Sequence, residues 1–361
     1  MADLRYWLGF NMAPRIGPVR LRALVHYFGD VEAAWRADAA ALRAAGLAQD
    51  ALERLVALRS RLDLDAAVAR VNALGLKVLT WDSPDYPALL RNIAQPPPVI
   101  YAKGTIIPAD EFAVAVVGTR HASAYGKEVA RRLARGLAEN GVTVVSGLAL
   151  GIDGVAHRAA LDGGGRTLAV LACGLDTVYP SSHRELADRI VTSGALISDY
   201  PVGTRPEAAN FPPRNRLISG LSLGTLVVEA GIKSGALITV RFALEQGRET
   251  FAVPGNIYNQ SSTGTNALIQ AGEAKLVTSV NDILEELNLT MVSHHTEVRE
   301  IVPETAEERA LLAHVGPEPV HLDELVRASG LATATVSSTL VMMELKGMVR
   351  RVDNTSYILA H

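Results

Sequence analysis

The residues best suited to chemistry lie where apolar runs of the sequence give way to glycine and arginine. In the first such loop Gly118 allows a tight turn, and Arg120 offers a guanidinium that can hold a phosphate through two parallel N–H groups. Ser123 and Gly126 open a basic, amphipathic segment whose first backbone N–H groups would form the positive end of a helix. Tyr125 could lie under a base. The loop therefore predicts a phosphate site, with an ordinary strand-to-helix turn and a surface arginine as the alternative.

A second glycine loop follows the next apolar run and begins with Ser146 and Gly147. Its later glycines, Gly151 and Gly154, are too widely spaced for the dinucleotide fingerprint, whose first two glycines stand two residues apart. This spacing argues against a nicotinamide or flavin cofactor, and we expect no cofactor.

The titratable residues of this region have a catalytic and a structural interpretation. Asp153 and His157 stand four residues apart, so on a helix they share a face and form either a structural pair or part of an acid/base site. Cys173 and Asp176 could add a Cys/His nucleophile, but a small cysteine in an apolar segment is typical of packing. We find no metalloprotease motif, no nucleophile elbow and no paired carboxylates at a strand end, and we predict that the protein is not an enzyme.

A third group of cations surrounds an amide. Arg214 and Arg216 could anchor successive phosphates, Asn215 could bond a base edge or the backbone, and Phe211 could stack on a base. A buried phenylalanine and a structural pair of arginines are the competing interpretation.

A lysine stands at the entrance to a later helix, in the sequence Lys233, Ser234 and Gly235. The upstream glycines of a Walker loop are missing, so we expect no intrinsic NTPase activity.

These loops need a scaffold that brings them to one edge. From about Lys77 short apolar runs alternate with amphipathic segments, which indicates an α/β fold with a Rossmann-like, mostly parallel sheet covered on both faces. Ligands in such folds bind beyond the carboxyl ends of the strands, where these loops lie. The predicted strands are Lys77–Thr80, Val99–Tyr101, Ala113–Val117, Thr143–Val145, Thr167–Leu171, Ala195–Ile197, Thr225–Val228, Thr250–Val253 and Lys275–Val277.

The sheet occupies the middle of the chain. We predict a helical domain over residues 1–75, the Rossmann-like domain over 76–288, a polar linker over 289–305 and a winged-helix domain over 306–361. The second and third helices of the last domain should meet at Gly330, and its would-be recognition helix offers only Lys346 as a cation. We therefore expect that helix to contact protein rather than read a major groove.

Composition places the chain among globular proteins. Its 361 residues are 48% hydrophobic, which is enough for real cores, and its single cysteine forbids an internal disulfide. A net charge of −3 gives no general attraction to nucleic acid or membranes, so phosphate binding must be local. No apolar run approaches the roughly 18 residues that cross a bilayer, and Asp3 and Arg5 interrupt the amino end. We expect a cytoplasmic protein.

Four motifs, kept in order and spacing, resemble the DNA processing protein A family, DprA/Smf. They are Gly118-Thr-Arg-His-Ala-Ser-Ala-Tyr-Gly126, Ser146-Gly-Leu-Ala-Leu-Gly-Ile-Asp153, Phe211-Pro-Pro-Arg-Asn-Arg216 and Glu229-Ala-Gly-Ile-Lys-Ser-Gly235. Many members of the family carry a SAM-like helical domain before the Rossmann-like domain and a winged helix after it, which agrees with the flanks predicted here.

The resemblance implies a protein that binds single-stranded DNA, protects incoming DNA and loads the RecA recombinase during natural transformation. It implies a homodimer formed through the Rossmann-like domain, and contact with single-strand binding protein. Carried over by position, the polar DNA contacts are Arg120, Arg214, Asn215, Arg216 and Lys233, with Phe211 as the aromatic and Gly118, Ser146, Gly147 and Gly151 shaping the pocket. Five phosphate contacts would give a log–log salt slope of about −3.5.

Two rival functions stay open at this point. Ser222-Leu-Gly-Thr225 followed by Glu229 is similar to a loop of lysine-decarboxylase-like phosphoribohydrolases, although the glycine-rich motif is incomplete. The other rival function is a scaffold protein that binds its partners through the winged helix alone.

Overall fold

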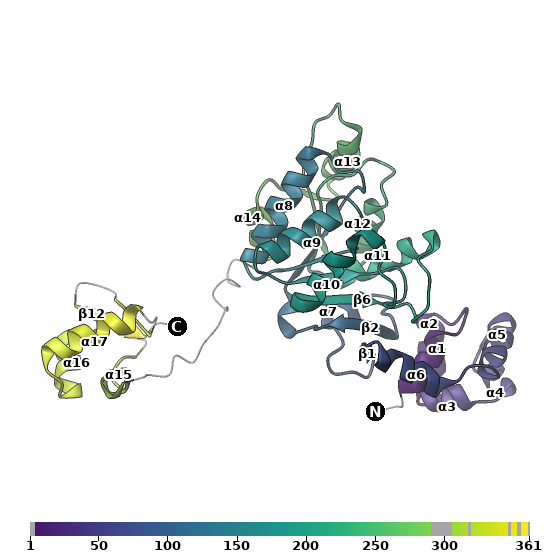
Figure 1. The fold of residues 1–361 in the computed structure, drawn as a ribbon, viewed down its shortest axis with the longest axis horizontal. Coiled ribbons are helices and arrows are strands. Elements are labelled where there is room, and N and C mark those ends of the chain that lie inside the picture. The colour runs from purple at the N-terminus through teal and green to yellow at the C-terminus, as the bar shows by residue number, and fades with distance from the viewer. Residues whose placement is uncertain (1–3, 290–304, 317–318, 346–347, 352–354, 360–361) are drawn as a thin grey trace. The chain divides into compact units, whose positions relative to one another are not determined.

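The computed structural model describes residues 4–289, 305–316, 319–345, 348–351 and 355–359 (Figure 1). The chain divides into two compact units, Met1–His294 and His295–His361, and each is described by itself. The helical region and the sheet share the first unit, so the predicted boundary near residue 75 marks a change of secondary structure, and its status as a domain boundary stays a prediction.

One mixed sheet organises the first unit. Among the described residues its strand order is β1-β2-β6-β5-β4-β3-β7-β8-β9, parallel from β6 to β9, with β1 and β2 added antiparallel at one edge. The strands are β1 Lys77–Thr80, β2 Val99–Gly104, β3 Ala113–Val117, β4 Thr143–Ser146, β5 Thr167–Val170, β6 Gly194–Ser198, β7 Gly224–Val227, β8 Glu249–Ala252 and β9 Lys275–Leu276. The predicted mostly parallel sheet is confirmed, and apart from β2, which continues to Gly104, the strand ends lie within one residue of the prediction.

Helices cover both faces of this sheet, as continuous apolar strands require (Figure 1). One face packs against α8 Ala124–Glu139, α9 Ile152–Asp162 and α14 Val280–Glu286. The other packs against α7 Ala88–Arg91, α11 Phe211–Gly220, α12 Ala236–Glu245 and α13 Thr263–Gln270. Since β3 leads into α8 and its neighbour β7 leads into α12, the chain leaves these two strands toward opposite faces and opens a crevice between them.

The amino-terminal region is all helical, as predicted. Its helices are α1 Leu4–Asn11, α2 Pro18–Phe28, α3 Val31–Arg36, α4 Ala39–Ala44, α5 Gln49–Arg59 and α6 Leu64–Ala73. Three of them begin after an aspartate whose carboxylate accepts a backbone N–H of the first turn: Asp30, Asp38 and Asp63. These helices and α10 Arg184–Ser193 share a core with β2 and β5.

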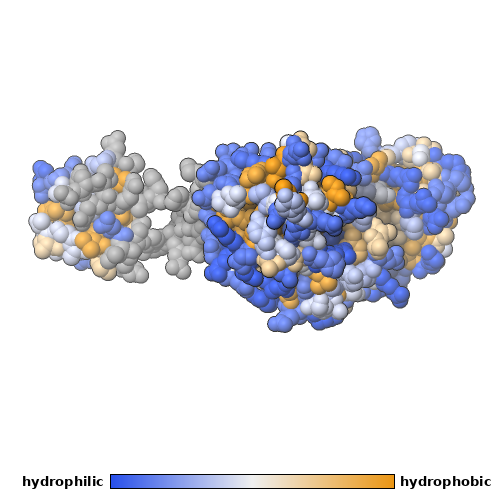
Figure 2. All heavy atoms as spheres, turned by 90° about the horizontal axis from the view of Figure 1, so that it is seen from above, coloured by the Kyte–Doolittle hydropathy of each residue, from blue (hydrophilic) through white to orange (hydrophobic). Residues whose placement is uncertain are grey.

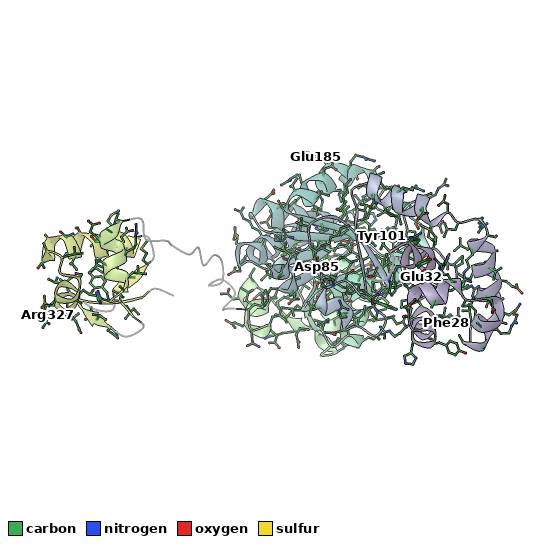
Figure 3. All side chains as sticks on the ribbon, turned by 90° about the horizontal axis from the view of Figure 1, so that it is seen from below. Phe28, Glu32, Asp85, Tyr101, Glu185 and Arg327 are labelled. Carbon is green, nitrogen blue, oxygen red and sulfur yellow. The ribbon has the colours of Figure 1, made fainter. Side chains whose placement is uncertain are left out.

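Trp7 and Trp81 meet edge to face where the helical region joins the sheet, with ring centroids 5.7 Å apart. Tyr101 of β2, labelled in Figure 3, is fully buried at the same junction and donates a hydrogen bond to Asn11 Oδ1 over 2.8 Å. The helical region therefore joins the sheet through a defined aromatic contact and a buried hydrogen bond.

The second unit has the winged-helix order. Helices α15 Ala306–Leu312, α16 Leu322–Ser329 and α17 Thr333–Leu345 accompany a small sheet of β10 Val320–His321, β11 Val349–Arg351 and β12 Ser356–Leu359. Gly330 caps α16 with a φ of +67°, which confirms the predicted turn. The short β10 was not predicted, and most of the predicted linker lies outside the described residues.

The surface visible in Figure 2 is mostly hydrophilic, with small and separate hydrophobic patches on the first unit. No single helix in the described ranges is both long and apolar enough to cross a bilayer.

Candidate nucleic-acid interface

A pocket of about 380 Å³ opens at the carboxyl end of β3 and β7, in the crevice described above. Its walls come from the loop after β3, the start of α9, one side of α11 and the start of α12. It therefore brings together residues from four separate sequence segments. The predicted site residues that line it are Gly118, Arg120, Phe211, Arg214, Asn215, Ser234 and Gly235.

An arginine stacked on an aromatic ring forms one wall. The guanidinium carbon of Arg120 lies 5.0 Å from the ring centroid of Phe211, and the Arg120 side chain is exposed. Behind this pair, Tyr179 meets Phe211 edge to face at 5.7 Å and is 44% exposed. Together the three side chains make a shelf, the Arg120–Phe211–Tyr179 shelf, with the main pocket on one side and a smaller hollow on the other.

Tyr179 is a residue that the sequence analysis missed. It follows β5 in a long loop and carries no cation or glycine signal of its own. Its position after a strand of the parallel sheet, next to Pro180, was the one available hint.

Arg214 is the buried frame of the pocket. Its side chain donates to the carbonyls of Gly147, at 3.0 Å, and Val170, and so joins the ends of β4 and β5. Burial lowers the pKa of this guanidinium, against the opposite effect of the nearby Asp153 carboxylate. With a residue exposure of 4%, Arg214 shapes the pocket and offers little surface to a phosphate.

Asp153 stands opposite that guanidinium. It accepts hydrogen bonds from the backbone N–H groups of Gly147, at 3.1 Å, and Ala149, at 3.3 Å. Burial raises the pKa of this carboxyl, and Arg214 opposes the rise. The backbone of the glycine loop after β4 is thus hydrogen-bonded to both the Asp153 carboxylate and the Arg214 guanidinium.

Asn215 ties two walls of the pocket together. Its Nδ2 donates to the carbonyl of Gly235 over 3.3 Å, and its Oδ1 accepts from Arg214 Nε over 3.2 Å. Ser234 accepts from the N–H of Ala236 over 3.3 Å at the start of α12. Lys233 is exposed in the same loop, outside the pocket lining, and has no ion-pair partner among the described residues.

Arg216 does not reach the pocket. Its guanidinium pairs with Asp199 Oδ2 at 2.7 Å and donates to the carbonyl of Gln95 at 2.5 Å. The expectation that Arg214 and Arg216 grip successive phosphates needs correction, because residues two apart on a helix point about 200° away from each other. One arginine faces the pocket and the other faces the opposite side of α11.

The beginning of α8 is occupied by protein groups. Ser123 caps the helix by accepting from Gly126 N–H at 3.0 Å, and its own N–H donates to Glu229 Oε2 at 2.9 Å. Glu229 is 1% exposed, and its other oxygen accepts from the hydroxyl of Ser261. Glu229 therefore joins the loop after β7 to the loop before α8 and to the turn at Ser261, and it lies outside the pocket lining.

Tyr125 also lies apart from the pocket. Its hydroxyl donates to the carbonyl of Pro254 over 2.9 Å, and its ring is 51% exposed beside a different hollow that includes Asn256 and Asn259. The structure therefore separates Tyr125 from Arg120 and Phe211.

In the second glycine loop, Ser146 and Gly151 contact the backbone of neighbouring segments. Ser146 is buried and donates to the carbonyl of Val116 over 2.6 Å. Gly151 has a φ of +78°, and a Cβ there would lie 2.6 Å from the carbonyl oxygen of Arg120. Glycine at 151 thus lets the start of α9 pack directly under the Thr119–Arg120 turn.

The catalytic reading has no support in this geometry. His157 is bonded to Thr167 Oγ1 at 2.7 Å rather than to Asp153, and burial lowers its pKa to about 3. Burial raises the pKa of the Cys173 thiol to about 11. In the described part of the chain no group of three His, Cys, Asp or Glu side chains is placed to hold a metal ion.

Comparison with known proteins shows the family of this chain. Residues 77–288 match the family model described as DNA recombination-mediator protein A, and residues 296–354 match the DprA winged helix domain. The chain belongs to the DprA family. It is 35% identical to Protein Smf of Synechocystis, covering 99% of this chain and 98% of the relative, and 37% identical to Protein Smf of Escherichia coli, covering 98% and 95%.

Solved structures agree with this DprA assignment. DNA processing protein A of Streptococcus pneumoniae superposes with a TM-score of 0.69 at 34% identity, over 79% of this chain and 99% of that one. A Helicobacter pylori DNA processing protein A, described for its single-stranded DNA binding mode, superposes with a TM-score of 0.53 at 30% identity, over 59% and 96%.

Proposed function

We propose that this DprA protein is a recombination mediator that binds single-stranded DNA without sequence preference in the pocket between β3 and β7. The observation that carries the proposal is the Arg120–Phe211–Tyr179 shelf beside that pocket. An exposed guanidinium over an aromatic ring offers a phosphate partner and a stacking surface at one place, and every base has a face that can stack. The single-stranded DNA bound by the Helicobacter pylori relative supports this ligand class.

Few cations remain free to meet phosphates. Of the five polar residues carried over from the resemblance, Arg214 is buried and Arg216 is paired, so Arg120 and Lys233 are the cations that face solvent near the pocket. Two phosphate contacts per pocket give a log–log salt slope of about −1.4, in place of the −3.5 expected from five.

The test is a titration of a labelled dT oligomer at several salt concentrations. Replacing Arg120 with Gln should weaken binding and flatten the slope by about 0.7, because one phosphate contact is lost. R189Q is the matched control, since Arg189 is a surface arginine of α10 that pairs at 2.7 Å with Asp162, the last residue of α9, and neither residue lines the pocket. An affinity and slope unchanged in R120Q would remove Arg120 from the interface.

Protection of incoming DNA and loading of RecA are the finer parts of the proposal, with family membership as their support. Bound dT oligomer should resist a single-strand nuclease, and RecA filaments should form faster on oligomer coated with single-strand binding protein when this protein is present. The homodimer is tested by the sedimentation of the free protein. RecA assembly at the same rate with and without the protein would reject the loading role.

We also propose that the protein performs no reaction on nucleotides. Glu229 is enclosed by Ser123 and Ser261, so the carboxylate that a phosphoribohydrolase would use is not available. Purified protein incubated with nucleoside monophosphates should release no base. Base release that is abolished in E229Q would establish the enzyme instead.

A further inference from the structure

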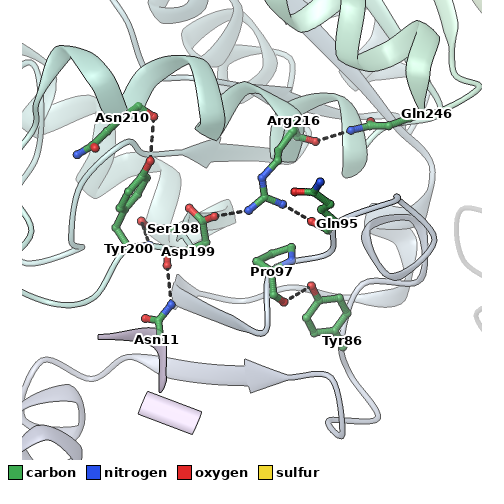
Figure 4. Close-up of polar contacts among 10 residues, drawn as sticks. All are labelled: Asn11, Tyr86, Gln95, Pro97, Ser198, Asp199, Tyr200, Asn210, Arg216 and Gln246. Carbon is green, nitrogen blue, oxygen red and sulfur yellow. Dashed lines mark hydrogen bonds and ion pairs between the residues drawn. The ribbon is translucent and has the colours of Figure 1, made fainter. Parts of the chain in front are cut away.

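We infer that Arg216 positions the DNA-binding helix α11 instead of binding DNA, and that Asn11 of the amino-terminal helical region takes part in this positioning. The inference rests on the proposed function, because it explains how the pocket residues of α11 are held. It concerns a set of contacts, the α11 clamp, formed by Asn11, Asp199, Tyr200 and Arg216 (Figure 4).

The clamp is centred on the residues that follow β6. Asp199 Oδ2 pairs with Arg216 Nη2 at 2.7 Å, and the hydroxyl of Tyr200 donates to the carbonyl of Asn210 at 3.1 Å (Figure 4). Asn210 directly precedes α11, and Arg216 lies in its second turn. Two adjacent side chains therefore hold α11 at two points.

Arg216 is enclosed in this position. Its side chain is 16% exposed and that of Asp199 is 14% exposed. The second arm of its guanidinium donates to the carbonyl of Gln95 at 2.5 Å. The backbone carbonyl of Arg216 accepts at 3.0 Å from Nε2 of Gln246, the residue that follows α12. A guanidinium with both arms bonded to protein in a largely buried setting has no free face for a phosphate.

The amino-terminal region reaches the same clamp. The side-chain amide of Asn11, the last residue of α1, donates to the carbonyl of Asp199 at 3.1 Å. The side-chain oxygen Oδ1 of Asn11 accepts from the hydroxyl of Tyr101 at 2.8 Å, so both ends of this side-chain amide are hydrogen-bonded. A continuous path of hydrogen bonds thus runs from α1 through Asp199 to α11.

The path matters because α11 presents the pocket residues. Phe211 begins the helix, and Arg214 and Asn215 line the pocket from its first turns. If α11 tilts or slides, the Phe211 ring leaves Arg120 and the Asn215 bond to Gly235 breaks. Loss of the clamp should therefore weaken DNA binding without removing any contact to DNA.

The experiment compares R216Q, R216K and N11A in the full chain with R189Q as the surface control. We expect R216Q and R216K to lower dT oligomer affinity about tenfold, with the salt slope of the unchanged protein, because lysine cannot hold Asp199 and the Gln95 carbonyl at once. N11A should lower affinity in the same direction although it changes no charge. A slope flattened by about 0.7 in R216Q and restored in R216K would overturn the inference and make Arg216 a phosphate ligand.

Hydrogen exchange of the free protein separates this inference from the proposed function. In R216Q the backbone amides of residues 211–220 should exchange faster than in the unchanged protein and in R189Q, with no DNA present. If α11 exchanges at the same rate in all three, Arg216 does not position the helix, whatever the DNA titration shows. If the unchanged protein fails to bind the oligomer while α11 loosens in R216Q, the proposed function falls and the structural role of the clamp stands.

Discussion

At the scale of single residues, burial decides which polar side chains can act on a ligand. Arg120 keeps an exposed guanidinium on an aromatic ring, whereas Arg214, only 4% exposed, is bonded to backbone carbonyls. Both are arginines in glycine- or proline-rich motifs, and the sequence around them does not distinguish an exposed from a buried guanidinium. The difference between a ligand contact and a structural cation is therefore set by the environment of each side chain.

His157 gives a residue-scale prediction about acid stability. The unfolded chain takes up a proton at this histidine near its ordinary pKa of 6.5, while the buried native imidazole stays neutral down to about 3. A depressed native pKa means that the stabilising effect is present above pH 6.5 and is lost as the pH falls toward 3. Between pH 7 and pH 5 this one group should reduce the free energy of unfolding by about 2 kcal/mol.

Urea unfolding at pH 7 and pH 5 measures this effect. H157Q should lose that part of the pH dependence, since it has no imidazole to protonate. H121Q is the matched control because His121 is exposed, and it should keep the full dependence. An identical pH dependence in H157Q and the unchanged protein would show that His157 is not a source of acid sensitivity.

At the scale of elements, the pocket depends on how closely two loops approach. Gly151 has a φ of +78° and packs under the Thr119–Arg120 turn, whereas Gly164 has a φ of +74° and no atom within 4 Å of the place that a Cβ would take. Both glycines have a positive φ, and they differ in crowding. G164A is therefore a control for the cost of placing an alanine at a positive φ in open space.

We predict that G151A destabilises the protein more than G164A and that only G151A weakens dT oligomer binding. Each alanine meets the backbone penalty of a positive φ, on the order of 1–3 kcal/mol. At position 151 the methyl group must also displace the carbonyl of Arg120. Urea unfolding and the oligomer titration on both variants check this. Equal losses of stability and affinity in the two variants would mean that the Thr119–Arg120 turn has room to adjust.

At the scale of the whole molecule, a net charge of −3 leaves no general attraction to nucleic acid, so the proposed binding must depend on the local groups of the pocket. Residues 295–361 carry six Lys and Arg against ten Asp and Glu, so the second unit adds no net positive charge. Between Thr333 and Leu345 its helix α17 contains no lysine or arginine, and it exposes Val341 and Met342 at 43% and 50%. Such a face suits contact with protein better than contact with a DNA groove.

We therefore predict that duplex DNA competes poorly with single strands for the full chain. An unlabelled duplex should displace the labelled dT oligomer at least about tenfold less well, per nucleotide, than an unlabelled single strand of mixed sequence, because paired bases cannot stack on the shelf. The competition is measured at one fixed salt concentration. Equal displacement by duplex would point to a second DNA surface elsewhere on the chain.

The sequence by itself determined the framework of this protein. Short apolar runs between amphipathic helices indicate strands of a largely parallel sheet, and so the positions of β1 to β9 and of the glycine loops after β3 and β4 were predictable from local pattern. The antiparallel pairing of β1 and β2 at the edge was not. The motifs around Gly118, Phe211 and Lys233 were sufficient to predict the family, which the comparisons confirm. Local pattern is enough for these features because they depend on residues close together in the chain.

Only the tertiary structure decided which predicted residues meet. Arg214 and Arg216 part because the helix turns about 100° per residue, and their partners are chosen by packing: Val170 for one, and Asp199, 17 residues earlier in the chain, for the other. Packing likewise places Tyr179 against Phe211 and Tyr125 outside the pocket. Side-chain partners distant in sequence are set by how helices and strands pack, and no periodicity along the chain records that packing.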